Sequence, residues 1–410
     1  MRLMALGDKI MGGTSAYSKL GYEICTRLAK LGHQVAHIPI GRVNRMGKQA
    51  YQGVLIYPSG DDYFAEDVAW QSYLDFKADM LITIKDPWVF NQVYRLAANF
   101  VPFAVIDHVH VSQAIIARLE TAFRVIAISR FAQIELQRNK IVSYYIPHAV
   151  RCDLYKPLSP EQKAEARRLF GLPQDAFVIG IVAMNRSRKG IPRMLRGFKR
   201  FRELNPDANA HLMLWTNIQP RSPTEDITLG VSDVGVNLLP EIMDLGINDA
   251  VHWPDWQDVQ KIGGLPELSP TGNWDMQKLY GTFDVNFLCS MGEGAGLPYL
   301  EAAACGIASV GTDVAGGSEY IGPGLRVPWH DYLIFNTPGV RYVLPDIDGM
   351  AEALTKIYNT DRNKLGKRCR KFAEGYDWDL VMNLYWKRFL DECAEELHPL
   401  ITKEGLKAWA

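Results

Sequence analysis

Two carboxylates near residue 300 have a spacing that suits the binding of hydroxyl groups. Glu293 follows an apolar run at 285–288 that predicts a strand, and Glu301 follows Pro298, a residue typical of the first turn of a helix. Gly306 marks the predicted end of this helix. The intervening loop contains Gly294, Ala295, Gly296 and Leu297. Two such carboxylates can accept hydrogen bonds from separate hydroxyl groups, as a sugar nucleotide presents them, although helix capping alone would also explain Glu301.

A cationic turn follows another predicted strand, at 177–183. The turn contains Asn185, Arg186, Arg188 and Lys189. Pro192 then predicts the first turn of a helix. Three cations at the carboxyl end of a strand and beside a helix N-terminus suit a diphosphate, because open α/β sheets bind ligands at that edge. A basic surface turn is the alternative interpretation.

Gly12 and Gly13 lie between the first predicted strand and the first predicted helix. Glycines there let the backbone approach a ligand closely, and the helix N-terminus offers amides to an anion. A tight turn without a ligand is equally compatible with this short motif. The dehydrogenase fingerprint Gly-x-Gly-x-x-Gly is absent, which disfavours a nicotinamide-binding domain.

The elements that must position these residues follow a βα rhythm. Short apolar runs predict strands at 3–6, 35–40, 80–84, 103–106, 125–128 and 144–146, and again at 177–183, 211–215, 251–253, 285–288 and 308–311. Many lack alternation, as parallel strands covered on both faces do. The restart at 177, after a proline-containing stretch, predicts a second doubly wound sheet.

We therefore predict an α/β protein with a Rossmann-like domain over 1–155, a second over 156–376 and a terminal helical segment over 377–410. Apolar residues at helical spacing from Tyr17 to Leu31 predict the buried face of a helix, with Gly32 as its cap, and another helix is expected at 161–170. Residues 219–272 predict loops around one or two helices. The cationic run at 362–371 is expected to be a solvated helix face, with an anionic partner as the minor alternative.

Composition excludes several classes of protein. The 410 residues allow two to three domains at about 150 residues each. The 45 Lys and Arg balance 46 Asp and Glu, which argues against a dedicated nucleic-acid binder without excluding a local basic site. The six scattered cysteines include no Cys-x-x-Cys pair, and neither a signal peptide nor a membrane span is predicted. A cytoplasmic protein is expected.

On these motifs the chain resembles, over nearly its full length, the family 4 retaining glycosyltransferases (glycosyltransferase group 1) of the GT-B fold. Glu293 and Glu301 match the family's Glu-x7-Glu motif. Further matches are the Gly12-Gly13 loop with Tyr17, Gly32-His33-Gln34-Val35, Ile128-Ser129, Ile146-Pro147-His148-Ala149-Val150, Gly316-Gly317-Ser318-Glu319 and Tyr376-Asp377-Trp378-Asp379. The resemblance implies two Rossmann-like domains that face each other, with the terminal helix crossing back to the first.

The resemblance also implies a role for each matching residue. Glu293 would hold hydroxyls of the donor sugar and shape the reacting centre, and Glu301 would bind the ribose of the nucleotide. Lys189, with an arginine, would neutralise the departing diphosphate. Gly13 would donate backbone amides near phosphate or acceptor. His108 sits where family members place a histidine that faces the donor sugar.

Two positions depart from the family pattern. Members usually have an arginine six residues before the lysine, where this chain has Ala183. We infer that Arg186 or Arg188 substitutes, and Arg188 is favoured. The usual Asn-Gly after the strand-end proline is His148-Ala149 here. These departures leave the predicted fold intact but put the diphosphate geometry in question.

Some residues keep more than one interpretation. His108 and His110 are also compatible with a metal site, but the sequence shows no matching ligand cluster, so no metal is predicted. Trp215 and Trp256 follow predicted strands and would suit either a nucleobase pocket or the core.

The implied reaction moves a sugar from a nucleoside diphosphate sugar, with UDP or GDP favoured, to an acceptor hydroxyl with retention at the anomeric carbon. Lys189, the arginine and helix N-termini would stabilise the leaving group without a metal or other cofactor. The acceptor is predicted to be a glycan, a lipid-linked molecule or another hydroxyl compound. Arg42, Arg45 and Lys48 would suit contact with an anionic lipid, a phosphorylated glycan or nucleic acid, or form a solvated loop.

Three other functions fit the same fold. A catalytically silent sugar-nucleotide-binding protein is the first alternative, which Ala183 keeps open and the Glu293/Glu301 pair disfavours. A sugar-nucleotide epimerase is the second. A phosphorylase is the third, although the sequence offers no convincing context for its pyridoxal-phosphate lysine.

Overall fold

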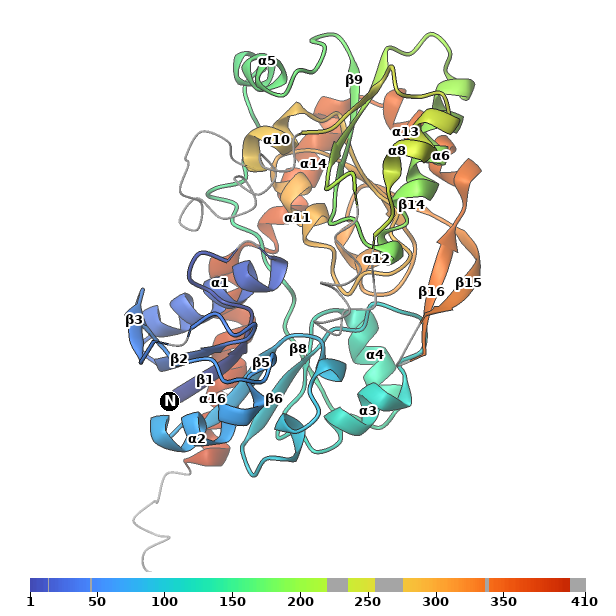
Figure 1. Ribbon diagram of the computed structural model, residues 1–410. Coiled ribbons are helices and arrows are strands. Elements are labelled where there is room, and N and C mark those ends of the chain that lie inside the picture. Colours follow the sequence, from blue (N-terminus) through green and yellow to red (C-terminus); the bar gives the residue numbers. More distant parts are fainter. Residues whose placement is uncertain (14, 45, 220–234, 255–275, 336–338, 399–410) are drawn as a thin grey trace, which may run out of the picture.

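Two parallel sheets, one above the other in Figure 1, organise the computed structural model of the chain. The structure describes residues 1–13, 15–44, 46–219, 235–254, 276–335 and 339–398. Sheet strands and their covering helices alternate along the chain, as the βα rhythm predicts. The predicted α/β architecture with two Rossmann-like units is confirmed.

The first sheet has eight strands in the order β3-β4-β2-β1-β5-β6-β7-β8, parallel except for the pair β3 and β4. Its strands are β1 (Arg2–Gly7), β2 (Gln34–Pro39), β3 (Gln49–Tyr51), β4 (Val54–Ile56), β5 (Met80–Ile84), β6 (Phe100–Ala104), β7 (Ile126–Ala127) and β8 (Tyr144–Tyr145). The prediction placed β6 three residues too late because Pro102 lies inside it, and proline is rare in central strands. It missed β3 and β4, a short hairpin whose outer strand is only half-buried.

The helices of the first domain include the predicted one after β1. They are α1 (Ala16–Lys30), α2 (Glu66–Phe76), α3 (Gln113–Leu119) and α4 (Arg130–Arg138). Ser15 caps α1 by accepting a hydrogen bond from the Ser18 amide at 3.0 Å. Gly32, with φ of +91°, follows its last turn as predicted. Leu31, expected in the core, is 46% exposed because it lies in the capping turn.

The second sheet has six parallel strands in the order β11-β10-β9-β12-β13-β14. They are β9 (Phe177–Val182), β10 (Ala210–Trp215), β11 (Val251–His252), β12 (Val285–Leu288), β13 (Ser309–Thr312) and β14 (Leu325–Val327). The five predicted strands are confirmed within two residues. A sixth strand, β14, and an antiparallel hairpin of β15 (Trp329–Phe335) and β16 (Val340–Pro345) were not predicted.

Helices cover this second sheet. They are α5 (Pro160–Leu169), α6 (Ile191–Leu204), α8 (Leu238–Asp244), α10 (Met276–Thr282), α11 (Leu297–Ala304), α12 (Gly317–Tyr320), α13 (Ile347–Tyr358) and α14 (Arg362–Glu374). Most of the predicted loop region 219–272 lies outside the described residues. On α14 the cations are mostly exposed, as expected. Arg370 is the exception, since it donates to the carbonyls of Tyr155 and Ala304.

The terminal segment returns to the first domain, as the GT-B resemblance implies. It consists of α15 (Trp378–Val381), a π-helical turn (Met382–Trp386) and α16 (Lys387–Leu397). Trp386 packs against Phe103 of the first sheet with ring centroids 6.0 Å apart. The wider π turn shifts the register of the buried face, so Trp386 is buried while Leu384 is 56% exposed.

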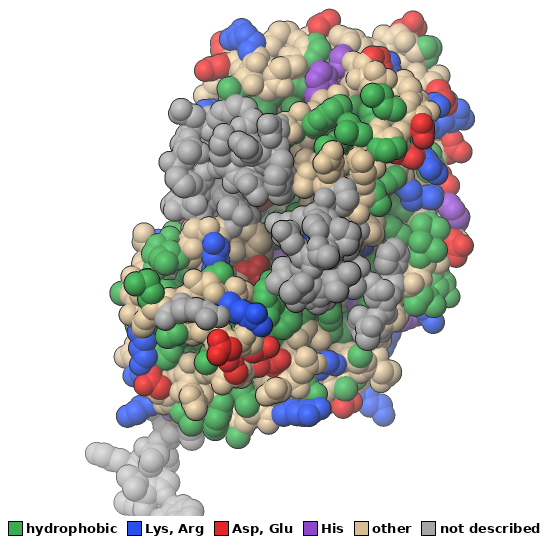
Figure 2. All heavy atoms as spheres, viewed as in Figure 1, with side chains coloured by type: hydrophobic (Ala, Val, Ile, Leu, Met, Phe, Trp, Pro, Cys, Tyr) green, Lys and Arg blue, Asp and Glu red, His purple; other side chains and the backbone are tan. Residues whose placement is uncertain are grey.

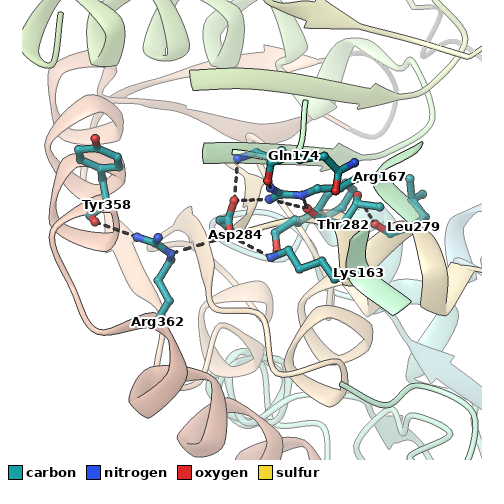
Figure 3. Close-up of polar contacts among 10 residues, drawn as sticks. Lys163, Arg167, Gln174, Leu279, Thr282, Asp284, Tyr358 and Arg362 are labelled. Carbon is teal, nitrogen blue, oxygen red and sulfur yellow. Dashed lines mark hydrogen bonds and ion pairs between the residues drawn. The ribbon is translucent and has the colours of Figure 1, made fainter. Parts of the chain in front are cut away.

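A polar cluster at the amino end of the second sheet joins several of these elements (Figure 3). Asp284, just before β12, accepts from Lys163 Nζ at 2.9 Å and from Arg167 Nη2 at 2.7 Å, both on α5. Its second oxygen also accepts the Val178 amide of β9 at 2.8 Å. Arg362, at the start of α14, stands 3.8 Å away. The cluster fastens α5 and α14 to the neighbouring strands β9 and β12.

Candidate active site

The candidate site lies at the opposite, carboxyl end of the second sheet, where the loop after β12 meets the turn after β9. Glu293 is 7% exposed and forms an ion pair with Lys189. Arg188 Nη1 stands 3.7 Å from the other carboxylate oxygen of Glu293. The structure therefore brings the predicted cationic turn and the first predicted carboxylate into direct contact.

The charges of this group adjust one another's protonation. Burial acts to raise the pKa of Glu293, but the nearby Lys189 and Arg188 outweigh it and hold that pKa below its ordinary value. Burial lowers the pKa of Lys189, and Glu293 opposes that change while Arg188 adds to it. Glu293 is thus ionised at neutral pH, as a hydrogen-bond acceptor for hydroxyl groups must be.

Arg188 reaches two carboxylates that belong to different domains. Its Nη1 donates to the Gly292 carbonyl at 3.0 Å and lies 3.7 Å from Asp107 Oδ2 of the first domain. Arg186 instead has an extended backbone before the short helical turn at Ser187–Lys189. Of the two arginines, Arg188 is the one beside Glu293, as the sequence interpretation favours. Ala183 packs against the core of the second domain.

His108 faces this group from the first domain. It is 1% exposed, and its Nδ1 lies 2.9 Å from Asp107 Oδ1. Burial tends to raise the pKa of Asp107, but the His108 hydrogen bond and the Arg188 charge lower it to about 2. His110 is exposed, with φ of +58°, so the two histidines do not converge. Among the described residues, no group of three or more His, Cys, Asp or Glu side chains could hold a metal ion.

Glu301 is on α11, in the second predicted carboxylate position. Its Oε2 accepts from Tyr280 at 2.7 Å and its Oε1 from Tyr155 at 3.1 Å. Lys19, on α1 of the first domain, stands 3.8 Å from Oε1. A cavity of about 30 Å³ is lined by Lys19, Tyr155 and Glu301 together with neighbouring residues. The tyrosines fix the carboxylate, whose oxygens can each accept more than one hydrogen bond.

The loop between the two carboxylates requires glycine at specific places. Gly296 has φ of +77° at the start of α11, a conformation that side chains rarely adopt. A Cβ at Gly294 would lie 2.7 Å from Val105 of the first domain. Ala295 is buried, and Leu297 begins α11. This loop therefore packs directly against the first domain.

Other predicted donor-binding residues are placed less centrally. Gly12, with φ of +65°, and Gly13 lie before α1, and a Cβ at Gly13 would be 2.2 Å from the Lys9 carbonyl. The Asn185 side chain donates to the carbonyls of Asn217 and Val236 and so connects the loop after β9 to these two residues.

Of the two predicted tryptophans, only one lies in the described part of the chain. Trp215 is 4% exposed and contacts Phe170 edge-on, so it belongs to the core. Trp256 lies outside the described residues, as does Arg45. Lys48, in the loop for which an anionic partner was considered, is paired with Asp75.

The first domain contributes charged residues that the sequence analysis missed. Lys85, just after β5, donates to Asp8 at 2.7 Å, just after β1. Asp86 lies beside them, and burial together with the charge of Asp107 raises its pKa. Burial and Asp86 likewise raise the pKa of Tyr17. Their positions after adjacent parallel strands are a signal that could have identified them.

The departure at 148–149 is accommodated between the domains. His148 is 7% exposed, and its ring stacks on Phe103 at a centroid distance of 6.5 Å. Its amide donates to the Tyr320 hydroxyl of the second domain at 3.0 Å. Burial lowers the pKa of His148 to about 4. The imidazole is therefore neutral at neutral pH and acts as a packing group.

The charged residues seen in Figure 2 are interspersed over this face, without a single large basic field. No helix of the described residues is long and apolar enough to cross a membrane. The interspersed charges agree with the nearly balanced charge of the sequence.

Comparison with known proteins finds similarity to the same family that the motifs resemble. Residues 176–360 match the family of group 1 glycosyl transferases. The chain is 29% identical over 176 residues to the D-inositol 3-phosphate glycosyltransferase of Stackebrandtia nassauensis, which covers 42% of this chain and 35% of that protein. It is 25% identical over 267 residues to the enzyme of the same name from Saccharomonospora viridis, covering 61% and 53%. The chain thus spans about a third to a half of these relatives.

Solved structures show the fold over nearly the whole chain. Sucrose-phosphate synthase from Thermosynechococcus elongatus superimposes with a TM-score of 0.68 at 17% identity, covering 96% of this chain and all of that one. Anabaena Alr3699/HepE in complex with UDP-glucose superimposes with a TM-score of 0.65 at 14% identity, covering 95% and 100%. The predicted GT-B fold and the resemblance to group 1 glycosyltransferases are confirmed.

Proposed function

We propose that this chain, a GT-B protein that matches the group 1 glycosyl transferases over residues 176–360, transfers a sugar from a nucleoside diphosphate sugar to an acceptor hydroxyl. The observation that carries the proposal is the group formed by Glu293, Lys189 and Arg188, opposite His108 of the first domain. It places an ionised hydroxyl acceptor and two cations within one site between the domains.

In this reaction Glu293 accepts hydrogen bonds from hydroxyls of the donor sugar, while Lys189 and Arg188 bind the diphosphate. Negative charge develops on the diphosphate as the glycosidic bond breaks, and fixed cations stabilise that charge without reorganisation. They supply the positive charge for the leaving group, so the proposed reaction needs no metal. Retention at the anomeric carbon follows from the resemblance to family 4.

Glu301 is proposed to bind the ribose of the nucleotide. Tyr155 and Tyr280 hold both of its oxygens, so the carboxylate is oriented before a ligand arrives. The UDP-glucose complex of the Anabaena relative supports a uridine nucleotide as one candidate donor. GDP sugars are the other candidates.

Charged groups of the first domain are proposed to bind the acceptor. Asp8, Lys85 and Asp86 follow the neighbouring strands β1 and β5 of the first domain, and Lys85 donates to Asp8. Carboxylates accept hydrogen bonds from hydroxyls, which suits a glycan or another polyhydroxy acceptor.

The experiment that tests this function is a thermal-shift screen with UDP, GDP and ADP sugars, followed by a transfer assay with the donor that stabilises the protein. A donor present at 100 times its Kd stabilises a protein by about 2.7 kcal/mol, which is readily measured. We expect stabilisation of the wild type, a much smaller shift for Lys189→Ala, and an unchanged shift for Arg200→Ala, whose ion pair with Asp348 is exposed.

Stabilisation by a donor without hydrolysis or transfer to any acceptor would favour the sugar-nucleotide-binding protein instead. Conversion of the donor to an epimeric sugar nucleotide would identify an epimerase. Equal shifts in wild type and Lys189→Ala would contradict the proposed donor site.

A further inference from the structure

The hairpin β15–β16 of the second domain lies between the two loops of the candidate site. The Val109 amide, in the loop that carries His108, donates to the Arg341 carbonyl of β16 at 3.2 Å. The Val343 amide of β16 donates to the Met291 carbonyl, in the loop that carries Glu293, at 2.9 Å. Tyr342 is the residue between these two backbone bonds, so its position is fixed from both sides.

The side chain of Tyr342 extends this connection into the site. Its hydroxyl donates to Asp107 Oδ2 at 3.0 Å, and the other oxygen, Oδ1, lies 2.9 Å from His108 Nδ1. The rings of Tyr342 and His108 also meet edge-on, with centroids 6.3 Å apart. Tyr342 is 9% exposed, so these contacts are largely shielded from solvent. Burial and the charge of Asp107 raise the pKa of Tyr342, which keeps its hydroxyl protonated as a donor.

The contact with Asp107 determines what His108 can do. An ionised carboxylate accepts hydrogen bonds only, so a neutral imidazole must carry its proton on Nδ1, and Nε2 is then an acceptor. Within the described part of the chain, His108 Nε2 is buried and has no hydrogen-bond partner. A buried acceptor without a partner is costly, which points to a hydroxyl donated by a ligand at this atom.

The loops of Glu293 and His108 and the hairpin are closely packed around Gly292. A Cβ at Gly292 would lie 2.0 Å from the Asp107 carbonyl oxygen and 2.7 Å from Cδ1 of Tyr342. The loop of Glu293, the loop of His108 and the hairpin therefore meet backbone to backbone.

We propose that Tyr342 is a positioning residue that, through Asp107, fixes the orientation and the Nδ1–H tautomer of His108 so that Nε2 accepts a hydrogen bond from a substrate hydroxyl. This inference rests on the proposed function for the identity of the substrate. The control of His108 by Tyr342 can be tested by a measurement that does not require transfer activity.

The first test is kinetic and compares Tyr342→Phe with Tyr332→Phe. Tyr332 is on the partner strand β15 and is 42% exposed, so it controls for the loss of a hydroxyl from the same hairpin. We expect Tyr342→Phe to lower kcat about tenfold with an unchanged KM for the donor, the effect of losing one hydrogen bond to a charged group. Tyr332→Phe should keep wild-type kcat. Equal kcat for wild type and Tyr342→Phe would overturn the proposal.

The second test observes His108 directly by imidazole ¹⁵N NMR on the full chain, with the signal assigned by its loss in His108→Gln. We expect the Nδ1–H tautomer in wild type and Tyr332→Phe, and a mixture of tautomers in Tyr342→Phe and in Asp107→Asn. An unaltered His108 signal in Tyr342→Phe would overturn the proposal even if the turnover of that variant fell. Absence of transfer by the wild type contradicts the proposed function, and the NMR comparison then still decides the role of Tyr342.

Discussion

Asp284 and Glu293 flank the same strand, β12, and each is met by cations, yet the two ends of the strand have different architectures. At the amino end, the cations around Asp284 also bind backbone: Lys163 donates to the Phe283 carbonyl and Arg167 to the carbonyls of Thr282 and Gln174. These donors, and both oxygens of Asp284, are used within one domain.

At the carboxyl end, the partners come from both domains. Arg188 stands 3.7 Å from Glu293 and from Asp107, and His108 Nε2 lacks a partner among the described residues. A cavity of about 420 Å³ lies at the amino end, lined in part by Lys163, Asp284 and Arg362. A cavity with charged walls therefore does not by itself mark the site. The Asp284 cluster is satisfied and fastens the fold, whereas the Glu293 group retains capacity for a ligand.

The largest expected effect separates the two clusters by activity. Lys189→Ala should lower kcat about 10²- to 10³-fold, because it removes a preorganised cation from the developing charge of the leaving group. Lys163→Ala, the matched change at the other end of β12, should leave kcat of the folded protein unchanged. Steady-state transfer assays on both variants measure this difference in kcat. A similar kcat in the two variants would contradict the assignment of different roles to the two ends of β12.

The second effect separates them by stability. Asp284→Asn should reduce the free energy of unfolding by about 3 kcal/mol, because it leaves the cations of α5 without their carboxylate in a largely buried setting. Urea denaturation checks this, with Asp348→Asn as the control, since its pair with Arg200 is exposed. An unchanged denaturation midpoint for Asp284→Asn would show that the cluster does not fasten the fold.

The sequence predicted the parts of this contrast that depend on local pattern. The strand β12 and the helix α11, with Pro298 near its start and Gly306 after its end, follow from an apolar run and helix-end residues. The placement of Glu293 and Lys189 at the same edge of the sheet follows from their positions after parallel strands, whereas their direct contact is seen only in the structure. Asp284 was not singled out, because a single acidic residue before a strand has no distinctive spacing.

Contacts between distant segments account for most of what the sequence did not predict. Tyr342 is on a hairpin, and a pattern of alternating apolar residues can indicate a strand but not its neighbours. The approach of Tyr342 to Asp107 depends on how the two domains pack. Trp386 is buried because a π turn shifts the register of a helix, which periodicity alone cannot show. Tyr155 and Tyr280 contact Glu301 from segments that are distant in the sequence, so periodicity could not show these hydrogen bonds either.

A third, smaller effect concerns buried histidines of the first domain and the domain junction. Burial lowers the pKa values of His37 and His148 to about 4, from an ordinary 6.5. Between these values the unfolded chain binds more protons than the folded one, so stability falls as the pH drops below 6.5. At pH 5, each of the two histidines should therefore lower the free energy of unfolding by about 2 kcal/mol relative to pH 7.

Urea denaturation at pH 7 and pH 5 measures this loss. His148→Asn introduces the residue that is usual at this position in the family that the chain resembles. The variant should lack the contribution of His148 to the loss of stability between pH 7 and pH 5. An identical pH dependence in wild type and His148→Asn would contradict the assignment.

The smallest expected effect concerns Glu301. Tyr280→Phe removes one of its two tyrosine hydrogen bonds and should weaken donor binding about fivefold, which corresponds to about 1 kcal/mol. Tyr73→Phe is the matched control, because its hydroxyl contacts the Asp79 carbonyl away from the site. Isothermal titration with the donor gives both affinities, and an equal Kd for the two variants would remove Tyr280 from the nucleotide site.

The central claim is that the carboxyl end of β12 is the reacting centre of a sugar-transferring enzyme. Its most direct test follows transfer from the stabilising donor by NMR of the anomeric proton in wild type and Glu293→Gln, with folding verified by circular dichroism. We expect a glycosylated product with the donor's anomeric configuration in wild type, and turnover at least 10²-fold lower in the variant. Equal turnover in wild type and in folded Glu293→Gln would contradict it.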